Sequence, residues 1–284
     1  MANTFNTGVY PQEWATKLQE RLNAPTNWKE VANVIYTDSQ VLNLPYMSTE
    51  SVIQTGTRGT AYGFSDFALT NDTLTISTYK PVPMFIDRAD LAQCTLVNQM
   101  ELADRQGAII AEHLESSMLA QHSLWTDFDN ASIGGSAGNI TVSASNIDDI
   151  IRGVKREIRE NNCQDLANKN GVFIVWRPAD FELLEAYVQA NGFREADIAL
   201  KEGTMPGLRY MGVDHYVSNS HTSGHLFGGV KKVHQIGILK ATYGQIVVTQ
   251  DPSLQSGLGI VSRVDFGHNV PTGHITAVFD ILVA

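Results

Sequence analysis

Three histidines in the second half of the chain are the residues best suited by type and spacing to bind a metal ion. His221 and His225 are spaced i, i+4, and His215 is the nearest further histidine. Imidazole nitrogens are common zinc ligands, but a site needs three or four ligands held by regular elements. Here the i, i+4 pair lies in a segment of Ser, Thr and Gly rather than in a helix. The pattern favours ordinary polar histidines, and we expect no metal and no cofactor.

Nucleophiles and acid–base pairs are the other candidates for chemistry. Cys94 and Cys163 lie outside any CxxC pattern, so they are expected to be small apolar residues. The close carboxylate pairs are Asp148 with Asp149 and Glu112 with Glu115. Their places fit a helix N-terminus and a solvated helix face, respectively. No GxxxxGK[ST] or GxGxxG motif occurs. The letters Gly134-Gly135-Ser136-Ala137-Gly138 match GxSxG, but they lie in a Gly-, Ser- and Asn-rich stretch rather than between a predicted strand and helix, so no nucleophile elbow is expected. The sequence therefore predicts a protein that is not an enzyme.

The composition narrows the class of partner. The chain has 284 residues, 43% of them hydrophobic, which is enough for one or two domains. Its formal net charge is −10, and the basic cluster of residues 152–159 is interrupted by Glu157 and Glu160, as on a solvated helix face. Specific nucleic-acid recognition is therefore disfavoured. Charged residues make up only 18%, against about 25% in typical proteins, which fits either surface hidden against other chains or ordinary variation.

The chain carries no sign of a membrane segment. The first ten residues lack a basic stretch followed by an apolar run, so we expect no signal peptide. No stretch approaches the ~18 apolar residues of a membrane span.

The hydrophobic periodicity predicts an α+β fold. The strongest pattern covers residues 91–121, where apolar side chains recur every three or four positions without a proline. It predicts one unusually long helix. Residues 146–190 read as helix, strand and helix, and strands follow at 215–217, 233–239, 246–249, 259–266 and 275–283.

Two segments near the N-terminus have little core of their own. Residues 1–47 mix short helical patches with extended pieces and form an arm. Residues 48–83 are rich in Gly, Ser and Thr, with a turn signal at Asn71-Asp72 and prolines 81 and 83 that suit an edge strand. We read them as a long two-stranded excursion. Because an isolated hairpin is marginal in water, it needs a partner, either its own body or another subunit.

The order of these elements resembles the tailed-phage major capsid proteins with the Hong Kong 97-like fold, from about residue 45 to the end. The stretches that carry the resemblance are Ile86-Asp87-Arg88 with Asp90-Leu91-Ala92-Gln93, the helix–strand–proline pattern ending in Arg177-Pro178-Ala179-Asp180-Phe181, and Gly212-Val213 with Tyr216-Val217-Ser218-Asn219. The chain departs from the family at Asn162-Cys163-Gln164, where members usually have Asn-Val-Pro.

The resemblance implies a virion protein. It would self-assemble into pentamers and hexamers of an icosahedral shell around phage double-stranded DNA, which it would contact non-specifically. Assembly would take place in the host cytoplasm with a separate scaffolding protein, a portal and possibly a decoration protein. An encapsulin-like compartment shell, with the same fold and a protein cargo, is the alternative.

The resemblance also implies a division of the chain. Residues 1–47 would be the N-terminal arm and 48–83 the extended hairpin loop. Residues 84–145 plus 251–284 would form the peripheral domain with the long spine helix, and 146–250 the axial domain. The hairpin would lie over a neighbouring subunit. Its contact residues would be Arg58, Phe64 and Phe67, with Glu101 and Glu112 on the helix as charge partners.

Overall fold

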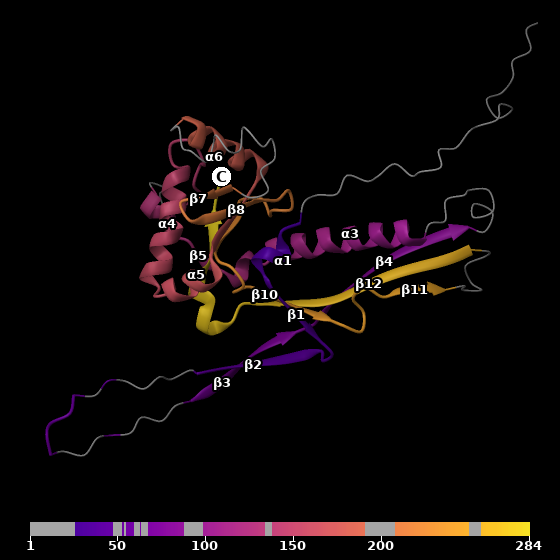
Figure 1. Cartoon of the computed structure of the whole chain (residues 1–284), viewed down its shortest axis with the longest axis horizontal. Coiled ribbons are helices and arrows are strands. Elements are labelled where there is room, and N and C mark those ends of the chain that lie inside the picture. The colour runs from indigo at the N-terminus through magenta and orange to yellow at the C-terminus, as the bar shows by residue number, and fades with distance from the viewer. Residues whose placement is uncertain are drawn as a thin grey trace, which may run out of the picture.

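The structure is a computed structural model that describes residues 26–47, 53, 55–59, 63, 68–87, 99–133, 138–190, 208–249 and 257–284. Helices and strands are mixed, which confirms the predicted α+β class. Figure 1 shows a rounded body, a long ribbon on one side of it and a hairpin that extends on the other. None of the described helices has the length and hydrophobicity of a membrane span.

A six-stranded sheet in the order β5-β13-β9-β6-β8-β7 forms the centre of the body. These strands are β5 (Thr126–Asp127), β6 (Val172–Trp176), β7 (Leu208–Tyr210), β8 (Val213–Val217), β9 (His225–Val230) and β13 (Val278–Leu282). Three helices, α4 (Ile147–Glu160), α5 (Gln164–Asn170) and α6 (Pro178–Ala190), pack beside it (Figure 1). β6 is an unbroken apolar run because it is buried between parallel β8 and antiparallel β9.

The helix α4 shows how the sequence pattern produces this packing. Its isoleucines at positions 147, 150, 151 and 158 fall on one helical face, and all are buried. Asp148 and Asp149 lie in its first turn, where the helix dipole favours negative charge, as predicted.

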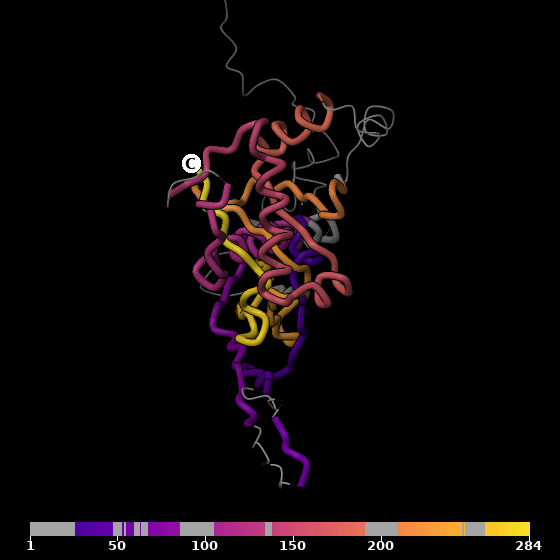
Figure 2. Tube along the Cα trace, turned by 90° about the vertical axis from the view of Figure 1, so that its left-hand side faces the viewer, coloured from indigo at the N-terminus to yellow at the C-terminus, as the bar shows by residue number. Residues whose placement is uncertain are grey.

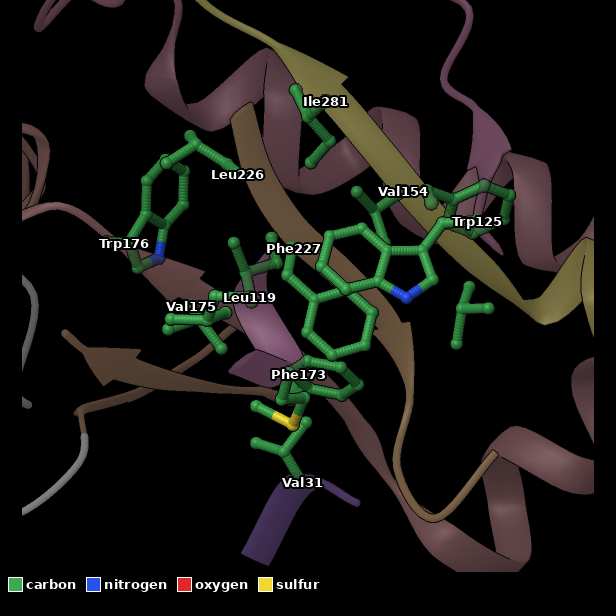
Figure 3. Close-up of a cluster of buried hydrophobic side chains, with 14 of the residues drawn as sticks. Val31, Leu119, Trp125, Val154, Phe173, Val175, Trp176, Leu226, Phe227 and Ile281 are labelled. Atoms are coloured by element: carbon green, nitrogen blue, oxygen red, sulfur yellow. The ribbon is translucent and has the colours of Figure 1, made fainter. Parts of the chain in front are cut away.

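Aromatic side chains fill the core between this sheet and the end of the long helix (Figure 3). Trp125 stacks on Phe227 with ring centroids 3.8 Å apart, and Phe173 meets Phe227 edge-on at 4.8 Å. Val31, the last residue of α1 (Trp28–Val31), and Leu119 join the same cluster. The N-terminal segment, the long helix and the sheet therefore share one core.

The second sheet forms the ribbon. β1 (Asn33–Thr37) pairs in parallel with β10 (Gln235–Leu239), which pairs with the end of β12 (Gly257–Asn269). Farther along, β12 lies between β11 (Ile246–Thr249) and β4 (Thr78–Asp87). β4 has no second partner among the described strands, so the predicted edge position of its two prolines is confirmed.

The long helix, α3 (Gln99–Leu119), runs along this ribbon (Figure 1). Its 21 residues correspond to roughly 32 Å at ~1.5 Å per residue. The first part of the predicted helix, residues 91–98, lies outside the described residues. The 3-10 turns η2 (His122–Leu124) and η3 (Asn130–Ile133) follow α3, and η4 (Thr272–Ala277) joins β12 to β13.

The hairpin is a separate two-stranded sheet of β2 (Val41–Met47) and β3 (Leu69–Thr75), and both views show it extending away from the body (Figures 1 and 2). The excursion therefore begins before the predicted residue 48. It also ends before residue 83, because residues 78–83 belong to β4 of the ribbon. The turn predicted at Asn71-Asp72 is wrong. Both residues lie inside β3, where pairing with Leu44 and Pro45 outweighs their local turn preference.

The two sheets cut across the predicted domain boundaries at residues 145 and 250. β5 and β13 belong to the sheet of the proposed axial segment, whereas β10 and β11 belong to the ribbon. The chain crosses from one sheet to the other after β9 and returns after β12. The predicted peripheral segment, 84–145 plus 251–284, was already discontinuous, but it includes β5 and β13 and leaves out β10 and β11.

Candidate functional site

Two extensions carry exposed apolar side chains on strands with free edges. On the hairpin, Val41, Met47 and Leu69 are 49%, 55% and 65% exposed. On the ribbon, the exposed apolar residues include Tyr79 and Phe85 of β4 and Val247 of β11. Single exposed apolar residues are ordinary. Here they gather on sheet-edge strands, whose unpaired backbone groups are a template for pairing with another chain. These surfaces are candidates for protein–protein contact.

The hairpin is held to the ribbon at its base by a notch of two facing glycines. Gly237 of β10 and Gly267 of β12 are directly opposite each other in the ladder. Thr75 and the buried side chains of Leu74 and Ile76 cross over them. A Cβ atom on Gly267 would come closer than 3.0 Å to the backbone of Thr75. The two glycines therefore let the hairpin base pass directly against the ladder.

A second contact steadies the hairpin. The Asp72 carboxylate accepts hydrogen bonds from the Thr272 backbone N–H at 2.7 Å and from the Thr272 hydroxyl at 2.8 Å. These two hydrogen bonds join β3 to η4. The direction of the hairpin is therefore set both by the glycine notch and by η4 of its own chain.

A buried glutamine fixes the long helix onto the ribbon. The Gln106 side chain is fully buried, and its amide donates to the carbonyl oxygens of Val82 at 3.2 Å and Ile260 at 3.5 Å. Its own carbonyl accepts a short hydrogen bond from the Ser262 hydroxyl. These bonds satisfy the polar groups of the side chain at the helix–sheet contact.

Two glutamates expected on solvated helix faces are buried instead. Burial raises the pKa of Glu115, and hydrogen bonds from Ser218 and from backbone N–H groups, including that of Asn27, partly offset it. Burial likewise raises the pKa of Glu157, which accepts from the Asp129 backbone N–H at 2.8 Å. Each side chain satisfies a donor that is distant in sequence, which residue spacing alone does not reveal.

A chain of hydrogen bonds joins the two sheets to α3. Trp125 Nε1 donates to His234 Nδ1 at 3.3 Å, His234 Nε2 lies 3.1 Å from His268 Nδ1, and His268 Nε2 lies 3.0 Å from Ser117 Oγ. Because an indole N–H only donates, His234 must accept at Nδ1 and donate from Nε2. His268 must then donate to Ser117. Burial lowers the pKa of both histidines, so both are neutral links at pH 7.

The three histidines singled out by spacing form no joint metal-binding group among the described residues. His215 is buried in β8 and accepts from Trp176 Nε1 at 2.9 Å, while β6 separates β8 from the β9 strand of His225. Burial lowers the pKa of His221 to about 4. His225 lies beside His122 and Asp280, a group that no sequence spacing reveals.

An open depression on α4 offers no catalytic arrangement. It has a volume of about 510 Å³ and is lined by Ser132, Ile133, Asp149, Arg152, Gly153 and Arg156. Arg152 pairs with Asp149 at 2.6 Å, and Arg156 donates to the Ser132 hydroxyl at 2.6 Å. Ser132 has an arginine and a backbone carbonyl as its partners rather than a general base.

The predicted contact residues are only partly described. Arg58 lies in a turn between β2 and β3, and Glu112 is half-buried on α3. Phe64, Phe67 and the side chain of Glu101 lie outside the described residues. Figure 1 shows the hairpin leaving the body on the side away from α3. A contact between Arg58 and Glu112 would therefore have to join two chains.

No family model and no curated protein matches the chain. Solved structures match it over almost its whole length. A structure from Mycobacterium phage Che8 is 17% identical with a TM-score of 0.73, and the match covers 96% of this chain and 97% of that one. For the capsid of the native GTA particle the identity is 12%, the TM-score 0.70 and the coverage 98% and 96%. The capsid of the Cyanophage P-SCSP1u is 13% identical with a TM-score of 0.66, and the match covers 98% of this chain and 94% of that one.

At these identities the likeness concerns the fold. The chain has the fold of phage capsid subunits, and the resemblance inferred from the order of its elements is confirmed at that level.

Proposed function

We propose that this chain is the major capsid protein of a tailed phage, and that it self-assembles into pentamers and hexamers of an icosahedral shell. The observation that carries the proposal is that each structural match covers almost all of this chain and almost all of the other chain. At least 94% of each of the three compared chains is matched. The match therefore includes the extensions as well as the core, and those extensions are the parts that a solitary protein would not need.

Within this proposal the fold is the Hong Kong 97-like fold. The six-stranded sheet with α4, α5 and α6 would be the axial domain around the pentamer and hexamer axes. The ribbon with α3 would be the peripheral domain, with α3 as its spine. The arm predicted over residues 1–47 would be confined to the residues before Trp28, because α1 packs in the core and β1 and β2 pair with strands of this same chain. Small changes in the angle between subunits let one sequence form both kinds of ring.

The hairpin of β2 and β3 would lie on a neighbouring subunit. We place Arg58, Phe64 and Phe67 in this contact, with Glu101 and Glu112 of the neighbour's α3 as charge partners. The exposed apolar side chains of the hairpin support this role, because burial against another chain would remove them from water.

The shell would enclose double-stranded DNA and contact it without sequence specificity. The net charge of −10 fits a container better than a reader of DNA. Assembly would take place in the host cytoplasm, with a separate scaffolding protein, a portal and possibly a decoration protein. The chain itself would have no catalytic role.

Electron microscopy and light scattering of the purified full chain test the proposal. Closed particles of uniform size are expected, and a monomer under all assembly conditions would contradict it. The contents of particles from infected cells separate the two shell types. Nuclease-protected DNA supports a phage capsid, whereas a protein cargo without DNA supports an encapsulin-like compartment.

A shortened hairpin tests the inter-subunit contact. Met47 and Leu69 face each other in the ladder, so an Asn-Gly turn in place of residues 48–68 should close the hairpin. The variant should keep the thermal stability of the body and lose the ability to form closed shells. Arg58→Glu should also block assembly, and adding Glu112→Arg in the same chain should restore it. Closed shells from the shortened chain would show that the hairpin role is wrong.

A further inference from the structure

His122, His225 and Asp280 form a cluster outside the surfaces proposed for assembly. Their candidate ligand atoms all lie within 4.8 Å of one another. His225 Nδ1 is 2.8 Å and 3.0 Å from the two carboxylate oxygens of Asp280, and His122 Nδ1 is 3.9 Å from the nearer one. The two imidazole rings stack with centroids 3.8 Å apart.

The sheet register brings these residues together. His225 faces Leu282 in the β9–β13 ladder, so it shares a face of the sheet with Asp280, two residues away. Asp127 is the partner of Asp280 in the β5–β13 ladder, and the same face therefore carries a second carboxylate. His122 comes from η2, three residues after the end of α3. Three separate segments, η2, β9 and β13, thus bring their ligand atoms together, and β5 adds a carboxylate on the neighbouring strand.

The electrostatics of the cluster favour a cation. Asp280 is 4% exposed, and Asp127, its partner in the β5–β13 ladder, is a second carboxylate on the same face. A buried carboxylate is costly unless a positive partner offsets it. The carboxyl end of α3 lies nearby, because Thr222, close to His225, donates to the Leu119 carbonyl at 3.5 Å. The negative end of the helix dipole adds to the attraction for positive charge.

We propose that His122, His225 and Asp280 bind a divalent zinc-class metal ion, with water or Asp127 as the fourth ligand. Two imidazoles and one carboxylate with an open position are a donor set that Zn²⁺ takes readily. Mg²⁺ and Ca²⁺ prefer oxygen ligands throughout, so this set disfavours them. The ion would tie the end of α3 to β9 and β13, across segments far apart in the sequence.

The ligand atoms are close to the spacing that an ion requires, and the His122 ring must turn out of its stack on His225 to aim a nitrogen at the ion. At ~2.0–2.2 Å from the metal, tetrahedral ligands lie about 3.3 Å apart. The separations of 2.8 Å and 3.9 Å to Asp280 bracket this value. The side chain of His122 is 32% exposed, so it has room to turn. In the metal-free pair the His225 Nδ1–H must be the donor, since a carboxylate accepts. When the metal takes Nδ1, this proton leaves to solvent and Nε2 carries the ring proton, taken up from solvent if the ring was neutral.

Zinc binding by the full chain tests the proposal. After treatment with a chelator, the purified protein is dialysed against Zn²⁺, and bound metal is measured by mass spectrometry. We expect one ion per chain and a higher melting temperature with Zn²⁺ than without it. Co²⁺ in place of Zn²⁺ should give the visible absorption of a tetrahedral complex. A wild-type chain that binds no zinc overturns the proposal.

Ligand variants locate the ion. His122→Ala and His225→Ala should weaken zinc binding by at least about 100-fold, because even the loss of an outer partner costs about 10–100-fold. His274→Ala, at an exposed histidine outside the cluster, should bind zinc as the wild type does. His122 is half-exposed, so its variant should fold, and far-ultraviolet circular dichroism checks this. Undiminished binding in both ligand variants, or equal loss in the control, overturns the assignment. These measurements need no shell formation, so their outcome is independent of the capsid proposal.

Discussion

Replacing Gly267 with alanine should weaken the attachment of the hairpin to the ribbon. The new methyl group would meet the carbonyl group of Thr75 at less than 3.0 Å. Backbone atoms cannot rotate out of the way as the end of a side chain can. Either β3 shifts away from the ladder, or the hairpin base detaches from it.

The two responses differ in their free-energy cost, and the response with the lower cost is expected. Overpacking a well-packed site costs typically about 1–3 kcal/mol. Detachment would expose Leu74 and Ile76, now 0% and 4% exposed, at about 1.5–3 kcal/mol each. Alanine also stabilises the folded state by about 0.5–1 kcal/mol relative to glycine, because it loses less conformational entropy on folding. We therefore expect a shifted but attached hairpin and a net loss of about 1–2 kcal/mol.

The assay is urea denaturation of the unassembled chain, followed by tryptophan fluorescence. Gly107→Ala is the matched control, because Gly107 lies on the exposed face of α3 with no atom near its missing side chain. This control should stabilise the protein by about 0.5–1 kcal/mol. If Gly267→Ala also stabilises the protein, the notch does not constrain the hairpin and the reasoning is refuted.

Three further predictions concern buried polar groups and the hairpin anchor. Burial lowers the pKa of His215 and of His268 to about 4, so between pH 6.5 and about 4 the unfolded chain binds more protons than the folded one. The free energy of unfolding, measured in urea, should therefore decrease as the pH is lowered from 6.5 to about 4, by on the order of 3 kcal/mol per histidine. A flat profile would contradict the burial of both rings. Gln106→Ala should cost about 2–4 kcal/mol of unfolding free energy, since it leaves a cavity and unpaired carbonyls, whereas Ser262→Ala should cost about 1 kcal/mol; equal losses would count against Gln106 as the anchor. Asp72→Ala should speed hydrogen exchange in β3 roughly fivefold, equivalent to about 1 kcal/mol, and unchanged exchange would mean that its bonds to η4 contribute nothing.

The elements that the sequence predicted well are those whose hydrophobic pattern is local. The isoleucine stripe of α4 and the apolar run of β6 are visible within a few residues, and α4, β6 and α6 include the helix, strand and helix predicted over residues 146–190. Pro178 likewise begins α6 as expected. In each case the signal lies within a few consecutive residues: a stripe of period 3.6 in α4, a continuous apolar run in β6 and a proline at the first position of α6.

The elements that the sequence missed depend on contacts between distant segments. β9 was not predicted, because Gly228 and Gly229 inside it look like a turn. The structure gives the reason for glycine there: a Cβ on Gly229 would come closer than 3.0 Å to the backbone of Ala277 and Val278. The cluster of His122, His225 and Asp280 was hidden for the same reason, since its residues meet only once the sheet order is known.

The burial gradient along the hairpin links its fold to its proposed role. Along β3, Leu74 at the base is fully buried on the notch of its own chain, whereas Leu69 at the far end of the ladder is 65% exposed. β2 has exposed apolar side chains at both ends, at Val41 and Met47. A hairpin meant to pack on its own body would bury apolar side chains along its length. One that is anchored only at the base has its direction fixed by its own chain, while its outer apolar side chains remain available. Its remaining stabilisation must then come from a surface outside the described chain, which is what a shell of repeated copies would supply.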